Sequence, residues 1–189
     1  MKVFSFILTV LIAFTLLSAG IHLTRTHKEH AIKIALEQEN ARLKREIHDT
    51  RIKTIVKDIR RVNSRIDEET AKKIAKAFIK YGKEFNIKIH RLLQIASVES
   101  RFNHRAINSV SGDYGLMQIN WRVWGRRFAK SPKELLDIDK NVRVACAIMA
   151  YNKRIGFKRI GHYHSFNPEF VSVYEERLAP FSRRFAKTY

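Results

Sequence analysis

The stretch from His27 to Ile66 contains neither proline nor glycine, and this absence limits how that part of the chain can fold. Apolar residues recur along it in steps of three, four, seven or eight, at Leu36, Leu43, Ile47, Ile55, Ile59, Val62 and Ile66. Such spacing predicts one long helix with a narrow apolar seam, in which about 40 residues reach roughly 60 Å. We interpret residues 25–66 as a basic helical spacer. Two alternatives stay open for this helix. It either self-associates through residues 32–66 as a coiled coil or stands as a single helix in solvent.

An uncharged apolar segment precedes this helix. Residues 3–23, VFSFILTVLIAFTLLSAGIHL, carry no charged side chain, and about 20 such residues span the hydrocarbon core of a membrane as a helix. We assign residues 1–24 as a membrane anchor or signal segment. A retained anchor is favoured, because the apolar run is longer than the roughly 7–15 residues at the centre of a signal peptide. The flanking charges, Lys2 before the segment and Arg25 and Lys28 after it, favour a cytoplasmic position for the remainder.

The chain is strongly basic. Its 189 residues include 37 Lys and Arg against 18 Asp and Glu, a formal net charge of +19. An excess of this size predicts an anionic partner, either nucleic acid, an anionic membrane or an anionic cell-wall polymer. A DNA-binding zipper is disfavoured, because acidic residues are interleaved with the basic ones in EQENARLKREIHD and a membrane segment comes first. We expect no specific binding of nucleic acid.

A single globular domain is expected from residue 67 to residue 180. Helical spacing returns after SRIDEET, where Ser64 or Asp67 can cap a new helix. A second helix from about Ile89 runs into Glu99. Later in the chain, the apolar segment NVRVACAIMAYNKR predicts a central, buried helix.

Between the helices lies a segment with a different pattern. From residue 103 to residue 118 the helical period gives way to Asn, Ser and Gly, which indicates short strands and turns. The last helix, around FVSVYEERL, is expected to end at Pro180, which leaves residues 181–189 as a basic tail. The predicted fold class is therefore mainly α with a small β excursion.

Glu99, at the end of the apolar segment IHRLLQIASVE, is the first candidate for chemistry. Partial burial disfavours the charged form of a carboxyl group and raises its pKa. A carboxylic acid that keeps its proton near neutral pH can donate it to a leaving oxygen. The alternative is a surface residue that pairs with Arg101 or Arg105. The flanking sequence favours the first role.

Four short motifs around and after Glu99 carry a resemblance to a known family. ASVESRFN, GLMQIN, DKNVRVA and YHS follow one another in this order before the last helix. In these motifs the chain resembles the lytic transglycosylases of the soluble type, which belong to the lysozyme-like superfamily. The resemblance covers residues 69–178 and leaves the spacer and the membrane segment outside. It implies a lysozyme-like domain, which in this chain is preceded by the predicted long helix and membrane segment.

The resemblance implies a role for each matching residue. Glu99 would be the catalytic acid and base. Gln118 and Met117 would line a sugar-binding groove, and Gly115 would allow the backbone to turn. Tyr163 stands where many members have the tyrosine of a Tyr-Asn pair, and its hydroxyl would lie near the acid.

Asp113 has three alternative roles. The segment DYGLMQINWRVW also resembles the aspartate-bearing strand of animal-type lysozymes, where the aspartate is the second catalytic carboxylate. Asp113 would then make the protein a hydrolase, since retaining glycosidases use two carboxyl groups. It could instead stabilise charge in a transglycosylase, or cap a turn in SGDYG.

Two further positions belong to the resemblance. His164 replaces the asparagine of the family's Tyr-Asn pair, and Asn141 matches a scaffolding asparagine.

The predicted function is cleavage of the MurNAc–GlcNAc β-1,4 bond in peptidoglycan glycan strands, without water and with a 1,6-anhydroMurNAc product. The alternatives are a hydrolytic muramidase that uses Glu99 and Asp113, and an inactive cell-wall-binding assembly subunit. No metal and no other cofactor is expected, because His162 and His164 lack further ligands around them. We expect the N-terminal helix to hold the chain in the inner membrane as a single-pass protein. The catalytic domain would face the periplasm or cell wall. This is the opposite of the orientation that the charges flanking the membrane segment favour.

Overall fold

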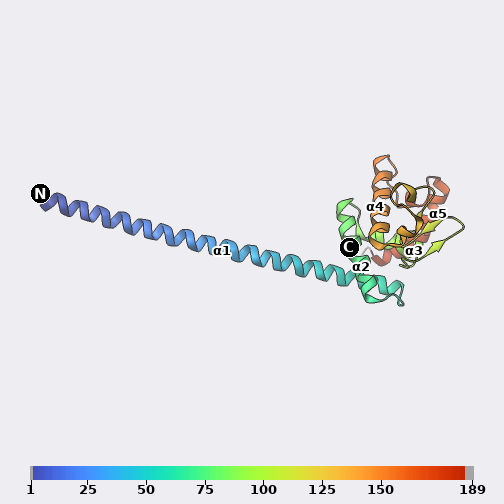
Figure 1. Cartoon of the computed structure of the whole chain (residues 1–189), viewed down its shortest axis with the longest axis horizontal. Helices are drawn as coiled ribbons and strands as arrows, with labels where there is room; N and C mark the ends of the chain where they lie inside the picture. Colours follow the sequence, from blue (N-terminus) through green and yellow to red (C-terminus); the bar gives the residue numbers. More distant parts are fainter. Residues whose placement is uncertain (1, 186–189) are drawn as a thin grey trace. The chain divides into compact units, whose positions relative to one another are not determined.

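The computed structural model describes the backbone of residues 2–185 and the side chains of Thr15 and of residues 28–185. The chain divides into two compact units, Met1–Thr50 and Arg51–Tyr189. The described residues are mainly helical, with one small three-stranded sheet, and this confirms the predicted balance of secondary structure (Figure 1).

Helix α1, Lys2–Val62, is continuous, as the absence of proline and glycine from residues 27–66 predicts (Figure 1). The globular domain is predicted to start at residue 67, whereas the second compact unit begins at Arg51. The reason is burial, because Ile55 and Ile59 are fully buried in the core of that unit. The end of α1 is therefore part of the globular unit.

The apolar seam of α1 divides accordingly. From residue 52 onward its side chains pack into the core of the second unit. Leu36, Leu43 and Ile47, by contrast, are exposed, Ile47 by 68%. Self-association through residues 32–66 therefore stays a prediction for the earlier, exposed part of the seam.

The predicted membrane segment, residues 1–24, lies almost wholly outside the residues whose side chains are described. Its backbone from residue 2 onward belongs to α1. Within the part of the chain that the structure describes, no helix has the length and apolar character of a membrane span.

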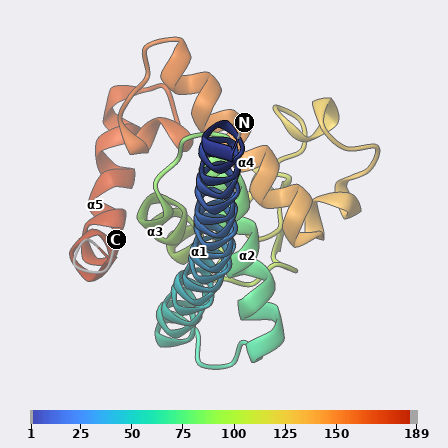
Figure 2. The ribbon, with the colours of Figure 1, turned by 90° about the vertical axis from the view of Figure 1, so that its left-hand side faces the viewer.

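Four further helices build the second unit: α2 (Glu68–Glu84), α3 (Ile89–Glu99), α4 (Ile138–Arg154) and α5 (Pro168–Phe185). Helix α2 packs against α4, and α3 packs against α5 (Figure 2). The carboxylate of Asp67 caps α2 by accepting the Thr70 N–H at 2.8 Å, which is one of the two predicted caps. Helix α4 buries residues on more than one side, so the predicted central helix is confirmed.

The strands lie in the segment where the helical period is lost. They are β1 (Ile107–Asn108), β2 (Asp113–Tyr114) and β3 (Ile119–Asn120), antiparallel and in that order in the sheet. In this register Asp113 lies opposite Asn108 on one side and Asn120 on the other. Short 3-10 helices connect the remaining elements: η1 (Gly125–Arg127), η2 (Pro132–Leu136) and η3 (Ile160–Tyr163).

The predicted end of the last helix is wrong. Pro180 lies inside α5, which continues to Phe185. Phe185 is fully buried, and its ring stacks on Phe181 with 6.3 Å between centroids. This packing retains the final turn although proline lacks an N–H for the helix. The predicted basic tail, residues 181–189, therefore begins within α5, and residues 186–189 lie outside the described residues.

Candidate active site

A cleft of about 620 Å³ opens in the second unit. Its walls come from the end of α3, the small sheet, α4, and the segment from η3 to α5. Four residues singled out from the sequence line it together: Glu99, Asp113, Gln118 and Tyr163. This volume falls in the range of about 300–1,000 Å³ that is typical of ligand sites.

Glu99 is the last residue of α3, and the backbone that follows it explains why the helix ends there. Arg101 and Phe102 both adopt left-handed conformations, with φ of 51° and 64°. The Phe102 N–H donates to the Ala96 carbonyl at 3.2 Å, and the Phe102 side chain is fully buried. This anchored turn stops α3 and leaves the Glu99 carboxyl in the cleft.

The surroundings of Glu99 raise its pKa from 4.5 to about 7. Burial is the largest cause, because it disfavours the charged carboxylate. A hydrogen bond from the Tyr174 hydroxyl, 2.5 Å from Glu99 Oε1, and the positive charge of Arg177 act in the opposite direction. The negative charge of Asp113 raises the pKa a little further. Near neutral pH this carboxyl group can therefore give up a proton and take one back.

Glutamine at position 99 should stabilise the fold at alkaline pH. Because the folded chain keeps a proton between pH 4.5 and 7 that the unfolded chain has lost, the stability of the parent protein falls with rising pH across this window. Glu99→Gln removes this cost. We expect a free energy of unfolding about 1–3 kcal/mol above the parent at pH 8, and no gain at pH 4. Denaturant unfolding at the two pH values measures this, and an equal difference at both would contradict the raised pKa.

Tyr174, which the sequence analysis did not single out, is the direct hydrogen-bond partner of Glu99. It lies on α5 with 1% of its surface exposed, and burial raises the pKa of its hydroxyl well above the usual value. The His164 ring stacks on the Tyr174 ring, with 4.8 Å between centroids and an interplanar angle of 1°. The Arg177 guanidinium lies 5.9 Å from the same ring centroid. Tyr174 is thus fixed by two contacts with residues that line the cleft. Its ring stacks on His164, and its hydroxyl donates to Glu99.

One signal in the sequence points to Tyr174. Val171, Tyr174 and Leu178 repeat at helical spacing, and all three are buried along α5. A tyrosine on the inward face of a helix needs a partner for its hydroxyl. The identity of that partner is not readable from the helix alone.

The turn of the GLMQ motif depends on Gly115 and on Asn141 of α4. Gly115 has a φ of +80°, and a Cβ on it would lie 2.2 Å from the Leu135 carbonyl oxygen. The buried Asn141 amide donates to the carbonyls of Tyr114, at 2.9 Å, and Leu135, at 2.7 Å. Its oxygen accepts the Met117 N–H at 2.7 Å. Asn141 therefore has the expected scaffolding position.

Alanine at position 115 is expected to destabilise the fold strongly. Gly112 provides a matched control, because it has the same φ of +80° while its added Cβ would meet only Arg122 Nε, at 4.0 Å. Both substitutions carry the cost of a left-handed backbone, but only Gly115→Ala forces atoms apart. We expect Gly115→Ala to lower the free energy of unfolding by about 1–3 kcal/mol more than Gly112→Ala. Equal losses in thermal or denaturant unfolding would contradict the close contact.

Met117 is predicted to line the sugar-binding groove, but it is not among the residues that line the cleft. Its side chain is fully buried in the core, and its backbone is the part that serves the site. The Tyr163 hydroxyl donates to the Met117 carbonyl at 2.7 Å, so Tyr163 faces the cleft without bonding to Glu99. Gly115 is likewise buried and acts through its backbone turn.

Gln118 lines the cleft in a left-handed conformation, with a φ of 47°. Its amide nitrogen donates to the carbonyls of Ala106, at 3.2 Å, and Gly115, at 2.9 Å. These two bonds fix the side chain against the turn. The polar wall of the cleft is therefore ordered without a ligand.

Asp113 lies in the same cleft on strand β2. Its carboxylate accepts hydrogen bonds from the Ser111 hydroxyl and from the Asn120 amide, the latter at 2.8 Å. These contacts stabilise the hairpin, as the predicted turn role requires. The carboxylate also raises the pKa of Glu99 through its charge, so its position is compatible with the turn role and with either catalytic role.

Aromatic residues form another part of the wall. Trp124 lines the cleft and meets Tyr151 edge to face, with 5.8 Å between ring centroids. Trp121 packs against the core instead.

Asn152 lines the cleft with 3% exposure, and its amide donates to the His162 carbonyl at 2.8 Å.

A metal site needs a cluster of ligands, and thiol chemistry needs a reactive cysteine. In the described part of the chain, no group of three or more His, Cys, Asp and Glu lies close enough to hold a metal ion. Cys146 is fully buried in α4, and burial raises the pKa of its thiol to about 12. Such a thiol stays protonated and belongs to the core.

A comparison with known protein families gives one match. A family model described as a transglycosylase SLT domain matches residues 76–170, just over half of the 189 residues. The curated proteins and the solved structures give no match. The matched segment contains Glu99, the GLMQ turn and Tyr163, and it ends before Tyr174 and Arg177.

Proposed function

Because this chain belongs to the transglycosylase SLT domain family and is a lytic transglycosylase that cleaves glycosidic bonds of peptidoglycan, we propose that Glu99 performs the cleavage as acid and then as base. The single observation that carries this proposal is the position of Glu99. Its carboxyl lies in the cleft with a pKa of about 7 and is oriented by the Tyr174 hydroxyl. A group with its pKa near the working pH serves both halves of an acid–base reaction.

The proposed reaction needs no water. Protonated Glu99 donates its proton to the oxygen that bridges MurNAc and GlcNAc, and the bond from that oxygen to C1 of MurNAc breaks. The Glu99 carboxylate then accepts the proton of the C6 hydroxyl of the same MurNAc, while O6 bonds to C1. The product carries a 1,6-anhydroMurNAc end, and Glu99 is again protonated. Each proton that leaves Glu99 is returned, so one carboxyl group is sufficient.

Asp113 supports a second candidate, a hydrolytic muramidase. Its carboxylate lines the same cleft, and its charge raises the pKa of Glu99. A second carboxylate can stabilise the oxocarbenium centre while water attacks C1. We favour the transglycosylase, because the family model that matches residues 76–170 describes a transglycosylase domain.

The mass of the products separates the two reactions. Purified protein digests peptidoglycan sacculi, and the released fragments are analysed by mass spectrometry. The proposal predicts ends that are lighter by one water than reducing MurNAc ends. Reducing ends as the main product would establish the hydrolase instead. Asp113→Asn extends the test, since a hydrolase should lose most of its activity with this change and the transglycosylase should keep most of it.

We further propose that the N-terminal segment anchors the enzyme and that the spacer holds it away from the membrane. The support is the uncharged stretch of residues 3–23 and the helical sequence that follows it. Since peptidoglycan lies outside the cytoplasmic membrane, the catalytic unit would face the periplasm or cell wall. Self-association would involve the exposed Leu36, Leu43 and Ile47. Protease treatment of spheroplasts tests the orientation, and protection of the catalytic unit would overturn it.

A further inference from the structure

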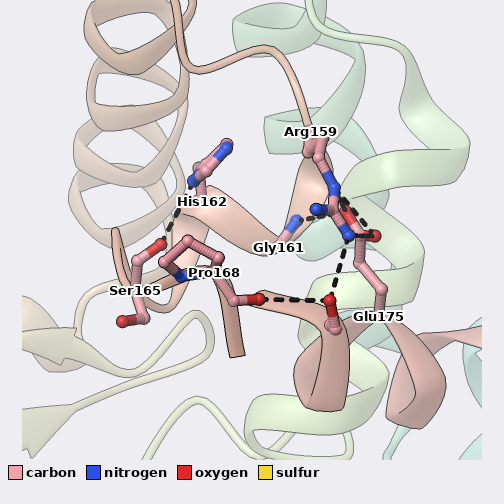
Figure 3. A network of polar contacts seen from close by, with 7 residues as sticks. Arg159, Gly161, His162, Ser165, Pro168 and Glu175 are labelled. Atoms are coloured by element: carbon pink, nitrogen blue, oxygen red, sulfur yellow. Dashed lines mark hydrogen bonds and ion pairs between the residues drawn. The ribbon is translucent and has the colours of Figure 1, made fainter. Parts of the chain in front are cut away.

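Glu175 fixes the segment around η3 to helix α5. Arg159 forms an ion pair with Glu175 at 2.6 Å, and the Gly161 N–H donates to the same carboxylate at 3.1 Å (Figure 3). One carboxylate of α5 thus binds both the residue before η3 and the second residue of η3. The hydrogen bond from Arg159 also lowers the pKa of Glu175, which keeps the carboxylate charged near neutral pH.

Gly161 lies directly against α5. A Cβ on Gly161 would lie 2.6 Å from the Val171 carbonyl oxygen, so a larger residue could not approach the helix as closely. This close approach brings the Gly161 N–H within reach of the Glu175 carboxylate. The Gly161 carbonyl in turn accepts the His164 N–H at 3.0 Å. A single backbone residue therefore links Glu175 to His164.

His164 completes a series of contacts that returns to α5 and ends at the acid. Its ring stacks on the Tyr174 ring with 4.8 Å between centroids, and the Tyr174 hydroxyl donates to Glu99 at 2.5 Å. Tyr174 and Glu175 are consecutive residues of α5, so the same helix carries both ends of the series. Burial lowers the pKa of His164, which keeps its ring neutral near pH 7 and above.

From these contacts we propose that Glu175 is a positioning residue that keeps the Tyr174 hydroxyl on Glu99. Glu175 holds η3 on α5 through Gly161, and this holds the His164 ring on Tyr174. The stacked ring fixes the direction in which the Tyr174 hydroxyl points. The inference rests on the proposed function, because Glu99 is then the acid that is positioned.

Of the two contacts of Glu175, the one with Gly161 carries this role. The Arg159 side chain is 52% exposed, and exposed ion pairs contribute little to stability. By contrast, the Gly161 N–H is part of the backbone turn that also binds His164. Loss of the ion pair alone should therefore leave the acid in place.

Glu175 has no direct effect on the protonation of Glu99. The titratable and charged groups around Glu99 come from α5, β2 and the η3 segment, and they are Tyr174, Arg177, Asp113, Tyr163 and His164. Glu175 neither lines the cleft nor changes the pKa of Glu99 through its own charge. A substitution at Glu175 must therefore reach Glu99 through the position of Tyr174.

The test measures the pKa of Glu99 by NMR in the full chain, as the titration of a side-chain carboxyl carbon that is assigned by its loss in Glu99→Gln. Glu175→Met keeps the length of the side chain but cannot accept the Gly161 N–H. We expect it to raise the pKa of Glu99 by about 0.5–1 unit, because the hydrogen bond from Tyr174 is weakened. The kcat on sacculi should fall about 3–10-fold, with a much smaller change in KM.

Three further variants accompany this measurement. Glu175→Ala should give the same shift as Glu175→Met, and it replaces that variant if the longer side chain does not fold. Glu175→Gln should restore the pKa of the parent, since its amide oxygen still accepts the Gly161 N–H although the ion pair is lost. Glu176→Ala is the matched control, because Glu176 is the next residue of α5, is exposed and does not line the cleft.

A double-mutant cycle separates positioning from a general loosening of α5. In a Tyr174→Phe background, Glu175→Met should cause no further shift in the pKa of Glu99, because the hydroxyl through which it acts is already absent. Equal shifts in both backgrounds, no shift in either, or a fall in the pKa as water enters the cleft would overturn the inference. A Glu175→Gln variant that behaves as Glu175→Met does would overturn it as well.

The pKa measurement does not depend on turnover, so it separates this inference from the proposed function. If the pKa of Glu99 shifts as expected but the parent does not cleave sacculi, the positioning role stands and the proposed reaction fails. If the parent cleaves sacculi and the pKa of Glu99 is the same in Glu175→Met, the reaction stands and the positioning role fails.

Discussion

Glu99→Gln is expected to lower kcat on peptidoglycan by about 10²–10⁴-fold, the range by which a positioned acid or base accelerates proton transfer. Glutamine occupies nearly the same space and can still accept a hydrogen bond from the Tyr174 hydroxyl, so the cleft should keep its shape. What it lacks is a proton to donate to the bridging oxygen. The loss should therefore appear in kcat and much less in KM. Release of soluble fragments from sacculi measures both.

The control for this prediction is another glutamate of the same unit. Glu176 on α5 is exposed and does not line the cleft, so Glu176→Gln should keep the activity of the parent. Full activity of Glu99→Gln would refute the assignment of the acid. The stability measurement at pH 8 is independent, because an inactive variant that is more stable than the parent cannot owe its inactivity to unfolding.

The helical pattern of the sequence predicts the position of Glu99 at the end of a helix, because that position depends only on neighbouring residues. The apolar period of IHRLLQIASVE predicts a helix that runs into Glu99, and α3 ends at that residue. The GLMQ turn is similar, since its glycine is needed for a backbone conformation that neighbouring residues cannot supply. Both features can be predicted because each depends on a few adjacent residues.

Contacts between distant segments are what the sequence does not reveal. Tyr174 and Glu99 are separated by 75 residues, and no local pattern links a tyrosine on one helix to the end of another. Met117 shows a related limit. A residue within a binding motif looks the same whether it contributes its side chain or, as here, its backbone carbonyl to Tyr163.

The start of the globular unit illustrates a third limit. Ile47 and Ile55 belong to one apolar seam, yet Ile47 is 68% exposed and Ile55 is fully buried. The helical period shows that a face is apolar, but it does not show what covers that face. Only the packing of α1 into the core shows that the unit begins at Arg51.

Tyr174→Phe should move the alkaline limb of the pH–rate profile to higher pH. The reaction begins with protonated Glu99, so kcat/KM of the parent should fall as the pH rises through about 7. The hydrogen bond from Tyr174 favours the carboxylate and lowers the pKa of Glu99. Without the hydroxyl this pKa rises, and the limb should move up by about one pH unit. We also expect kcat at the optimum to fall about 10-fold, because the carboxyl loses the contact that orients it.

A second tyrosine of the cleft separates this effect from a general disturbance of the site. Tyr163→Phe removes a hydrogen bond of similar length, but that bond goes to the Met117 carbonyl and not to Glu99. We expect Tyr163→Phe to lower activity without moving the alkaline limb. The measurement is kcat/KM on soluble glycan strands from pH 5 to pH 9 for the parent and both variants. An unchanged limb in Tyr174→Phe, or the same shift in both, would show that the Tyr174 hydroxyl does not set the protonation of Glu99.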